Sequence, residues 1–348
     1  MSTIVPLKIA VVAFELPRVN QKTGGVSHFN HRLCSALSEM GHDVTAFTSQ
    51  PTIPGVDYKT IIVEGAGEEE KGRFYRYYVA PLKSRKLDFR PYDLVLSSGD
   101  DWAMKRSGAK WLRIMHGSAL REMQHNKRLV RKVNLSFLYL LELFSSLRSD
   151  ATLFNSADTR KLYPTRSSDK IVHLPVDRRI FHPGPKEEAP TILFVGGLDS
   201  RKRGRWLLEL FNTVIKPQVP EAQLWMVSDK GPDAEGVTYY KNLGIEELAG
   251  LYRRAHVFSM PSTYEGFGIP YLEAMASGTL VVTTPNPGAN EILQHGRFGS
   301  IVQDHQLADS LTGALLNPQA HRDMVEAALE WADDHSWPAI IRQYLAYV

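Results

Sequence analysis

The stretch HVFSMPSTYEGFGIPYLEAMASGTLVVTT, residues 256–284, decides the fold. It begins with a strand-like apolar run, passes through a loop that contains Gly266 and Gly268, continues as a helical pattern and ends in a second buried run. Pro270 suits the first turn of that helix, where its missing N–H is not needed, and Gly278 suits the exit from the last turn. A strand, a helix and a strand in this order predict a βαβ unit, which builds a parallel sheet.

The same alternation runs through the rest of the chain. Because 348 residues are too many for one ordinary core, and prolines and charges cluster between residues 175 and 190, we predict two domains. The fold class is α/β, with two Rossmann-like doubly wound domains at 1–183 and 184–332. Such sheets bind ligands at the carboxyl ends of their strands, so the chemistry is expected there, in a central cleft between the domains. The strand-like runs are 7–14, 43–48, 92–98, 111–117, 191–197, 222–228, 256–262 and 279–284.

The composition is that of a water-soluble globular protein, with 43% hydrophobic and 23% charged residues. No run approaches the length of a membrane span, and the start lacks the features of a secretory leader, so a cytoplasmic location is expected. The single cysteine, Cys34, suits a reducing compartment, and we expect it to be a buried thiol. Lys and Arg outnumber Asp and Glu in residues 1–185 but not in the remainder. A basic half can face nucleic acid, an anionic membrane or an anionic substrate.

Two carboxylates flank the glycine loop of the opening stretch. A helical side chain leans towards the N-terminus of its helix, so Glu273 leans back towards the loop that carries Glu265. Gly266 and Gly268 let a backbone come close to a ligand, and free N–H groups at a helix start attract an anion. We interpret this as phosphate on the amides and a vicinal diol on the glutamates. The competing interpretation is structural: Glu265 caps the turn, Glu273 pairs with a surface cation, and the glycines serve the bend.

At these residues the sequence resembles glycosyltransferase family 4, the retaining GT-B enzymes of glycosyl transferases group 1. The segment 261–278, PSTYEGFGIPYLEAMASG, matches the donor-site motif of that family. Further matches follow in the family's order: Gly24-Gly25, MGHDVTAF, RIMHGS, NSADTRKL, PVDRRIFHP, FVGGLDSRK and HSWPAIIRQYL. The resemblance covers both domains, and it implies that 333–348 is a C-terminal helix packing back on the N-terminal domain.

The resemblance implies a role for each residue of the motif. Glu273 holds the ribose hydroxyls of the nucleotide, and Glu265 sits by the donor sugar. The amides of Gly266, Phe267 and Gly268 lie near the sugar and the diphosphate. The first domain is then the acceptor side, and the second binds the donor.

A departing nucleoside diphosphate accumulates negative charge, which preorganised cations and amides stabilise. Lys202, the amides of Gly24-Gly25 and the start of the helix at residue 270 are the candidates. The family usually has an arginine where this chain has Gly197 in its donor-binding loop, so one cation is missing, and Arg201 or Arg203 is the candidate to compensate.

The same resemblance implies retention at the anomeric carbon, by same-face attack without an enzymic nucleophile. The chain has no Asp-x-Asp triplet, so we predict metal independence, and no cofactor is expected besides the nucleotide-sugar donor substrate. His116 follows a strand, and the resemblance places it near the transferred sugar as a hydrogen-bond donor. Its alternative role is that of a satisfied core histidine. Asp100 and Asp101 also follow a strand, and we interpret them as a solvated turn.

A basic segment, 71–132, runs into HNKRLVRKVNLSFLYLLELF at 125–144. A basic amphipathic helix suggests peripheral contact with an anionic membrane, here at the inner face, and then a lipid-linked sugar or a growing polysaccharide as acceptor. The alternative, which we favour, is a solvated helix with a buried apolar face.

The leading hypothesis is a hexosyltransferase that uses a UDP-sugar, or else GDP-mannose, and a glycan, lipid-linked or polysaccharide acceptor. Two alternatives stay open: a sugar phosphorylase on the same fold, and a non-catalytic protein that binds nucleotide sugars or polyanions. No nucleic-acid partner is expected, because the basic segment lacks a recognisable reading module. The sequence gives no prediction of the oligomeric state.

Overall fold

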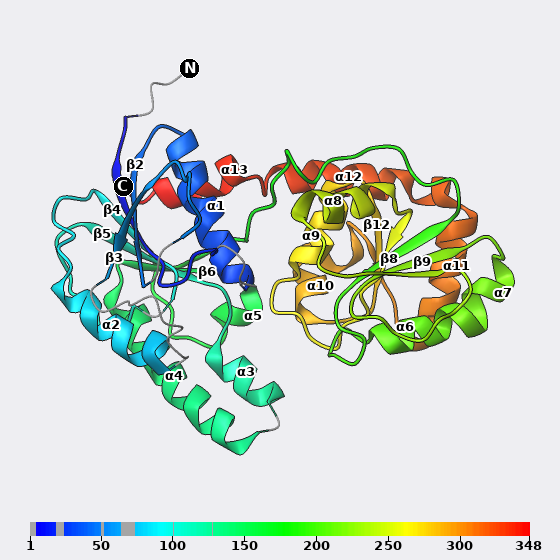
Figure 1. Cartoon of the computed structure of the whole chain (residues 1–348), viewed down its shortest axis with the longest axis horizontal. Helices are drawn as coiled ribbons and strands as arrows, with labels where there is room; N and C mark the ends of the chain where they lie inside the picture. The colour runs from blue at the N-terminus through cyan, green and yellow to red at the C-terminus, as the bar shows by residue number, and fades with distance from the viewer. Residues whose placement is uncertain (1–4, 19–23, 50–51, 64–73, 100, 127) are drawn as a thin grey trace. The chain divides into compact units, whose positions relative to one another are not determined.

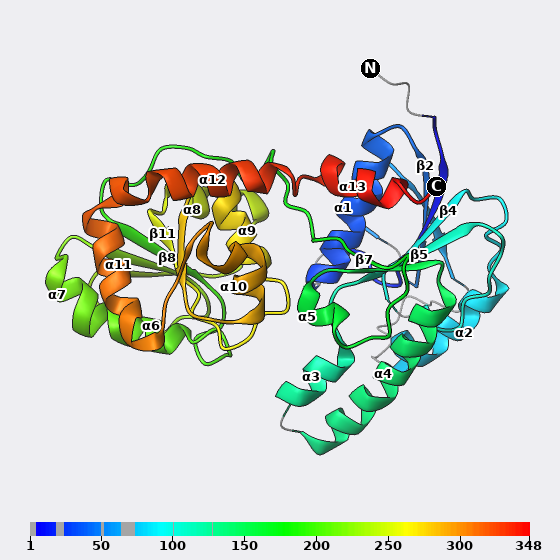
Figure 2. The same ribbon diagram turned by 180° about the vertical axis from the view of Figure 1, so that it is seen from behind.

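The computed structural model describes residues 5–18, 24–49, 52–63, 74–99, 101–126 and 128–348. The chain divides into two compact units, the first made of Met1–His173 with Ile340–Val348 and the second of Leu174–Ala339 (Figure 1). Each unit is built on one parallel sheet with helices packed around it (Figure 2). The prediction of an α/β protein with two Rossmann-like domains is therefore confirmed.

In the first unit the strand order is β3-β2-β1-β4-β5-β6-β7, and every pairing is parallel. The order reverses between β1 and β4, which is where a doubly wound sheet opens a crevice. The strands are β1 (Lys8–Val12), β2 (Asp43–Thr48), β3 (Lys59–Ile62), β4 (Leu94–Ser97), β5 (Lys110–Met115), β6 (Ala151–Phe154) and β7 (Lys170–Ile171). The helices are α1 (Gly25–Glu39), α2 (Ala80–Lys83), α3 (Ala119–His125), α4 (Leu129–Arg148) and α5 (Ala157–Arg160), and α13 (Trp337–Leu345) enters this unit at Ile340.

In the second unit the order is β10-β9-β8-β11-β12-β13, again parallel throughout, with the reversal between β8 and β11. The strands are β8 (Thr191–Val195), β9 (Gln223–Val227), β10 (Val237–Tyr240), β11 (Val257–Phe258), β12 (Leu280–Thr283) and β13 (Ser300–Ile301). The helices are α6 (Gly204–Leu210), α7 (Lys216–Gln218), α8 (Ile245–Arg254), α9 (Ile269–Ala276), α10 (Pro287–Ile292), α11 (Leu307–Leu316) and α12 (Arg322–Asp333).

The central strands carry nearly continuous apolar runs because helices cover both faces of each sheet. Ile9 and Leu94 in the first unit and Ile192 and Phe258 in the second are fully buried. Cys34 is buried as expected, and burial raises the pKa of its thiol far above the ordinary value. The thiol is therefore protonated and unreactive.

The division between the units falls at His173, whereas the sequence placed it at 183. The intervening residues join the second unit because Val176 pairs with Ser336, and because Arg178 Nε donates to Asp333 Oδ1 at 2.8 Å. Residues 340–348 group with the first unit, where the Tyr347 hydroxyl donates to the carbonyl of Ser168 at 2.7 Å.

Asp101 is fully buried, so its interpretation as part of a solvated turn is wrong. It forms an ion pair with Arg113 of β5, and its carboxylate accepts hydrogen bonds from Ser97 Oγ and, at 2.5 Å, from Ser145 Oγ. The physical reason is that Arg113 is only 2% exposed, and a buried guanidinium requires a counter-charge. Asp100 lies outside the described residues.

Helix α4 also differs from its favoured interpretation as a solvated helix with one buried apolar face. It buries Leu135 and Leu138 against the first unit but leaves a second apolar face exposed. Among the described residues no helix is both long and apolar enough to cross a membrane. The side chains of this second face, the α4 apolar face, are Leu129, Val130, Val133, Phe137, Leu140, Phe144 and Leu147.

Candidate functional site

The predicted donor residues of the second unit follow the carboxyl ends of two neighbouring strands, β8 and β11. Gly197 and Lys202 follow β8, and Glu265 follows β11; Asn286, which was not predicted, follows the next strand, β12. Glu273 belongs to α9, the helix that leaves the Glu265 loop. Strand ends on either side of a reversal in strand order are where ligands of such sheets bind.

The Glu265 carboxylate is 7% exposed and held on both oxygens. Ser262 Oγ donates to Oε1 at 3.2 Å, and Arg201 Nη2 donates to Oε2 at 3.3 Å. The Glu265 carbonyl accepts a hydrogen bond from Gly288 N at 2.8 Å. The carboxylate is thus oriented by its own loop, which agrees with part of the structural interpretation, while its remaining lone pairs stay available to a ligand.

The glycines near the site differ in whether packing or backbone conformation requires a glycine. Gly268 has φ +94°, and a Cβ there would lie 2.5 Å from Cδ2 of Tyr271. A Cβ on Gly288 would lie 2.7 Å from the carbonyl oxygen of Phe267. At Gly266 the nearest atom would be the Tyr264 hydroxyl at 3.4 Å. Backbone conformation and packing therefore require Gly268 and Gly288, whereas packing does not require Gly266.

Glu273 is half-buried on α9, and burial raises its pKa to about 7. The Tyr252 hydroxyl and the Lys202 ammonium act in the opposite direction and lower that pKa. Among the described residues, the cation that acts on Glu273 is therefore Lys202, which belongs to the candidate site. The structural interpretation had instead paired Glu273 with a surface cation. Near neutral pH the carboxyl is poised between its charged and neutral forms.

Lys202 connects the two glutamates electrostatically. Burial, followed by the charge of Arg201, lowers the pKa of its ammonium, while Glu265 and Glu273 raise it. Its Nζ donates to the carbonyl of Val195 at 3.2 Å. A Cβ on Gly196 would lie 2.4 Å from Cδ of Lys202, so the glycine makes room for this side chain.

The structure distinguishes the two arginines considered as replacements for the cation missing at Gly197. Arg203 donates to Asp304 at 2.6 and 2.8 Å and to Thr284 Oγ1 at 2.9 Å, so its guanidinium is committed to these contacts. The Arg201 side chain is 52% exposed beside Glu265. Arg201 is therefore the arginine placed to meet a ligand.

Sequence reasoning missed Tyr252, Ser262 and Asn286. Asn286 caps α10 by accepting from Ala289 N at 2.9 Å, and its Nδ2 donates to the carbonyl of Ser262 at 3.2 Å. An Asn between a strand and a Pro-initiated helix was a usable sequence signal for this cap. No comparable signal marked Tyr252, which reaches the site from α8.

In the first unit, His116 follows β5 and is half-buried. Its Nε2 lies 2.6 Å from Ser98 Oγ, and its ring centroid lies 4.5 Å from that of Phe29. Burial, followed by the charge of Arg113, lowers the pKa of His116 to about 4. The imidazole is therefore neutral at pH 7. It is partnered like a core histidine, yet it stands at a strand end where ligands bind.

Gly24-Gly25 open α1 and are exposed. A Cβ on either glycine would meet nothing within 4 Å, so packing does not explain their identity. The backbone N–H groups at this helix start are available for a ligand.

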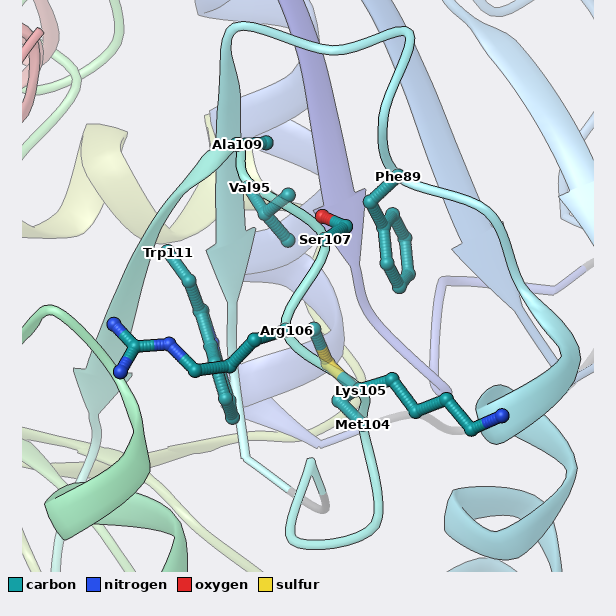
Figure 3. A pocket seen from close by; sticks show the side chains of 8 residues that line it. All are labelled: Phe89, Val95, Met104, Lys105, Arg106, Ser107, Ala109 and Trp111. Atoms are coloured by element: carbon teal, nitrogen blue, oxygen red, sulfur yellow. The ribbon is translucent and has the colours of Figure 1, made fainter.

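A small cavity of about 10 Å³ lies elsewhere in the first unit, against β4 and β5 (Figure 3). It has room for about one water molecule, too little for a sugar. The lining residues, labelled in Figure 3, are Phe89, Val95, Met104, Lys105, Arg106, Ser107, Ala109 and Trp111.

Comparison with known proteins connects this geometry to one family. Residues 189–321 match the family described as glycosyl transferases group 1. A D-inositol 3-phosphate glycosyltransferase of Corynebacterium urealyticum is 33% identical over 177 residues, which cover 44% of this chain and 42% of that protein. One of Nocardioides sp. is 31% identical over 216 residues, covering 51% and 47%. The chain thus spans less than half the length of these curated relatives.

Solved structures resemble the whole chain. Sucrose-phosphate synthase from Thermosynechococcus elongatus superposes with a TM-score of 0.76 at 20% identity and covers 98% of this chain and 100% of that one. Anabaena HepE, solved with UDP and glucose, gives 0.71 at 13% identity and covers 98% and 99%. Residues 189–321 therefore match the group 1 glycosyltransferases, and the chain as a whole has the GT-B fold.

Proposed function

We propose that the chain is a retaining, metal-independent glycosyltransferase that moves a hexose from a nucleotide-diphosphate sugar to a glycan acceptor. The observation that carries this proposal is the cluster of Lys202, Glu265 and Glu273 at the strand ends of the second unit, where one ammonium acts on two carboxylates. The likeness to Anabaena HepE, which has been solved in complex with UDP-glucose, favours a UDP-sugar over GDP-mannose.

Each group has a task in this reaction. The Glu273 carboxylate accepts the paired ribose hydroxyls, and Glu265 accepts from a hydroxyl of the hexose. As the bond from the anomeric carbon to the diphosphate breaks, the acceptor oxygen bonds to that carbon on the same face, and its proton passes to the departing phosphate. Lys202, Arg201 and the amides of Gly266 and Gly268 compensate the charge that develops on the diphosphate.

A panel of ligands tests the donor class through thermal unfolding. The panel contains UDP, GDP, ADP, their sugars and inorganic phosphate. A ligand at a hundredfold its dissociation constant adds about 2.7 kcal/mol of stability. We expect the uridine compounds to raise the melting temperature. A response to phosphate alone would favour the phosphorylase alternative, and nucleotide binding without donor hydrolysis or transfer would favour the non-catalytic one.

Replacing Lys202 by glutamine is expected to lower kcat about 10²- to 10³-fold, as the loss of one charge-stabilising donor does in other active sites. The measurement is release of nucleoside diphosphate under saturating donor. Lys216→Gln is the matched control, because Lys216 also donates to a backbone carbonyl, that of Ala222 at 3.2 Å, but from α7. Equal rates in the two variants would remove Lys202 from the mechanism.

We further propose that the α4 apolar face contacts an anionic membrane and that the acceptor is lipid-linked or a growing polysaccharide. Leu129, Val130 and Val133 are 76%, 84% and 65% exposed, which is far more apolar surface than scattered single side chains present. Arg128 precedes the helix and Lys132 lies within it, so an anionic headgroup layer complements the charge beside the face.

Phe137→Glu with Leu140→Glu is expected to weaken vesicle binding at least tenfold, since burying one such side chain contributes about 1.5–3 kcal/mol. Sedimentation with anionic and with zwitterionic vesicles measures it. The control is Leu316→Glu, which changes an exposed leucine of the second unit. Binding that ignores lipid charge, or a wild-type dimer that the double variant dissociates, would contradict the membrane proposal.

A further inference from the structure

A groove of about 360 Å³ lies at the opposite end of the second unit's sheet from the donor residues. Lys186 precedes β8, His256 immediately precedes β11, and Leu280 begins β12, so these three residues mark the amino-terminal edge of the sheet. The other wall comes from the end of α11, the turn Pro318–His321 and the start of α12. We call this the basic groove; its lining is completed by Gly278, Ala314, Pro318, Gln319, His321, Arg322, Val325 and Glu326.

Two side chains direct donors into the basic groove from fixed positions. Lys186 Nζ donates to the carbonyl of Ala255 at 2.9 Å and to Thr279 Oγ1 at 2.8 Å. An ammonium has three donors, so one remains. His256 Nδ1 accepts from Thr191 N at 3.2 Å, which places the proton of the neutral imidazole on Nε2 as a second donor.

These groups differ in the negative charge that acts on them. Burial lowers the pKa of Lys186 to about 8, and no carboxylate acts on it among the described residues. Burial, followed by the charge of Lys186, lowers the pKa of His256 more than Glu187 raises it. On the rim, Arg322 gives its Nε to Glu326 at 2.8 Å and keeps its remaining N–H donors. The lining therefore presents donors on Lys186, His256 and Arg322, while its one carboxylate, Glu326, is paired with Arg322.

The size and the floor of the groove suit a small molecule. Its volume falls at the lower end of the range of ligand pockets, about 300–1,000 Å³. Leu280 and Ala314 are 5% and 1% exposed and give it an apolar base beneath the polar donors. An apolar floor with a few convergent donors is the usual construction of a small-molecule site.

We propose that the basic groove is a second ligand site, which binds the oxyanion of a small phosphorylated or carboxylated metabolite through Lys186, His256 and Arg322. The site is separate from the donor site, because it lies at the amino ends of the same strands whose carboxyl ends carry Glu265 and Lys202. The proposal does not depend on which sugar is transferred, or on whether transfer occurs at all.

NMR of the full chain tests the proposal. The imidazole signal of His256, identified among those of the 12 histidines by its loss in His256→Gln, is followed while inorganic phosphate or acetate is added at constant ionic strength. We expect a saturable shift that weakens at least tenfold in Lys186→Gln and stays unchanged in the donor-site variant Lys202→Gln. Whichever of the two anions saturates first identifies the phosphate or the carboxylate class.

Two results would overturn the proposal. One is a shift that grows linearly and equals that produced by sodium chloride. The other is saturation that Lys186→Gln leaves unaltered. Because Lys186 also links two segments of the fold, Arg322→Gln on the exposed rim serves as a second variant, for which a weakening of at least threefold is expected. An unaltered affinity in Arg322→Gln would likewise count against the site.

Discussion

Replacing Glu273 by glutamine will stabilise the unliganded protein at pH 8 and weaken nucleotide binding about 10- to 100-fold. The binding loss follows because hydrogen bonds to a charged acceptor contribute about 1.5–3 kcal/mol, and an amide keeps only one acceptor oxygen. The gain in stability follows from the pKa of Glu273, which burial raises to about 7 from an ordinary 4.5. A single substitution thus acts in opposite directions on folding and on binding.

The way in which the free energy of unfolding depends on pH shows that Glu273→Gln is stabilising at pH 8. Between pH 4.5 and 7 the folded protein keeps a proton on Glu273 that the unfolded chain has lost, so the free energy of unfolding falls as pH rises through this window. Above pH 7 the penalty is complete, about 3 kcal/mol, and Glu273→Gln removes it. Urea unfolding at pH 5 and pH 8 measures this, with the exposed Glu221→Gln as control. A variant less stable than wild type at pH 8 would refute the prediction.

Breaking the buried ion pair of the first unit will have the largest effect on stability. Asp101→Asn or Arg113→Met alone is expected to cost about 3–5 kcal/mol, because each leaves an uncompensated charge in a dry core. That is a large part of the stability of an ordinary domain, about 5–15 kcal/mol. The double variant is expected to cost less than the sum of the two single variants, since neither charge then remains.

Urea unfolding followed by tryptophan fluorescence reports on this pair, because Trp111 Nε1 donates to Ser97 Oγ, itself a donor to Asp101. The two units can unfold in separate steps, so the transition of the first unit is the one to follow. Arg90→Met, which breaks an exposed pair with Asp88, is the control and should leave that transition in place. Additive losses in the double variant would mean that the two residues act independently.

The sequence predicted those parts of the fold whose information is local. The run 43–48 coincides with β2, and 191–197 contains β8. Strands β3, β6, β7, β10 and β13 were missed. Four of them lie at sheet edges: β3 exposes all its residues, β10 buries none fully, and β7 and β13 have only two residues each, so none of the four forms a buried apolar run. Strand β6 is buried but only four residues long. Edge strands are less buried than central strands, and their sequences accordingly lack a continuous apolar run.

In the candidate site, too, the sequence predicted local features but not those that depend on tertiary contacts. The geometry of one helix predicts that Glu273 leans towards the Glu265 loop, and in the structure the charges of both glutamates act on Lys202. The pairing of Arg203 with Asp304 and that of Arg113 with Asp101 depend on which loops and strands become neighbours, and no local pattern encodes this. An arginine inside the apolar run of β5 was nevertheless a visible sign that a buried counter-charge had to exist.

The division of the chain has a further consequence for how it responds to cleavage. The backbone passes from the first unit to the second at 173/174 and returns at 339/340. Near these passages Val176 N donates to the carbonyl of His335 at 2.8 Å. Residues 340–348 carry Ile340, Ile341 and Tyr344, all 1% exposed or less. A protease that nicks the peptide bond after His173 would therefore yield two fragments that remain associated under native conditions, tethered by that returning segment, and that separate only in denaturant.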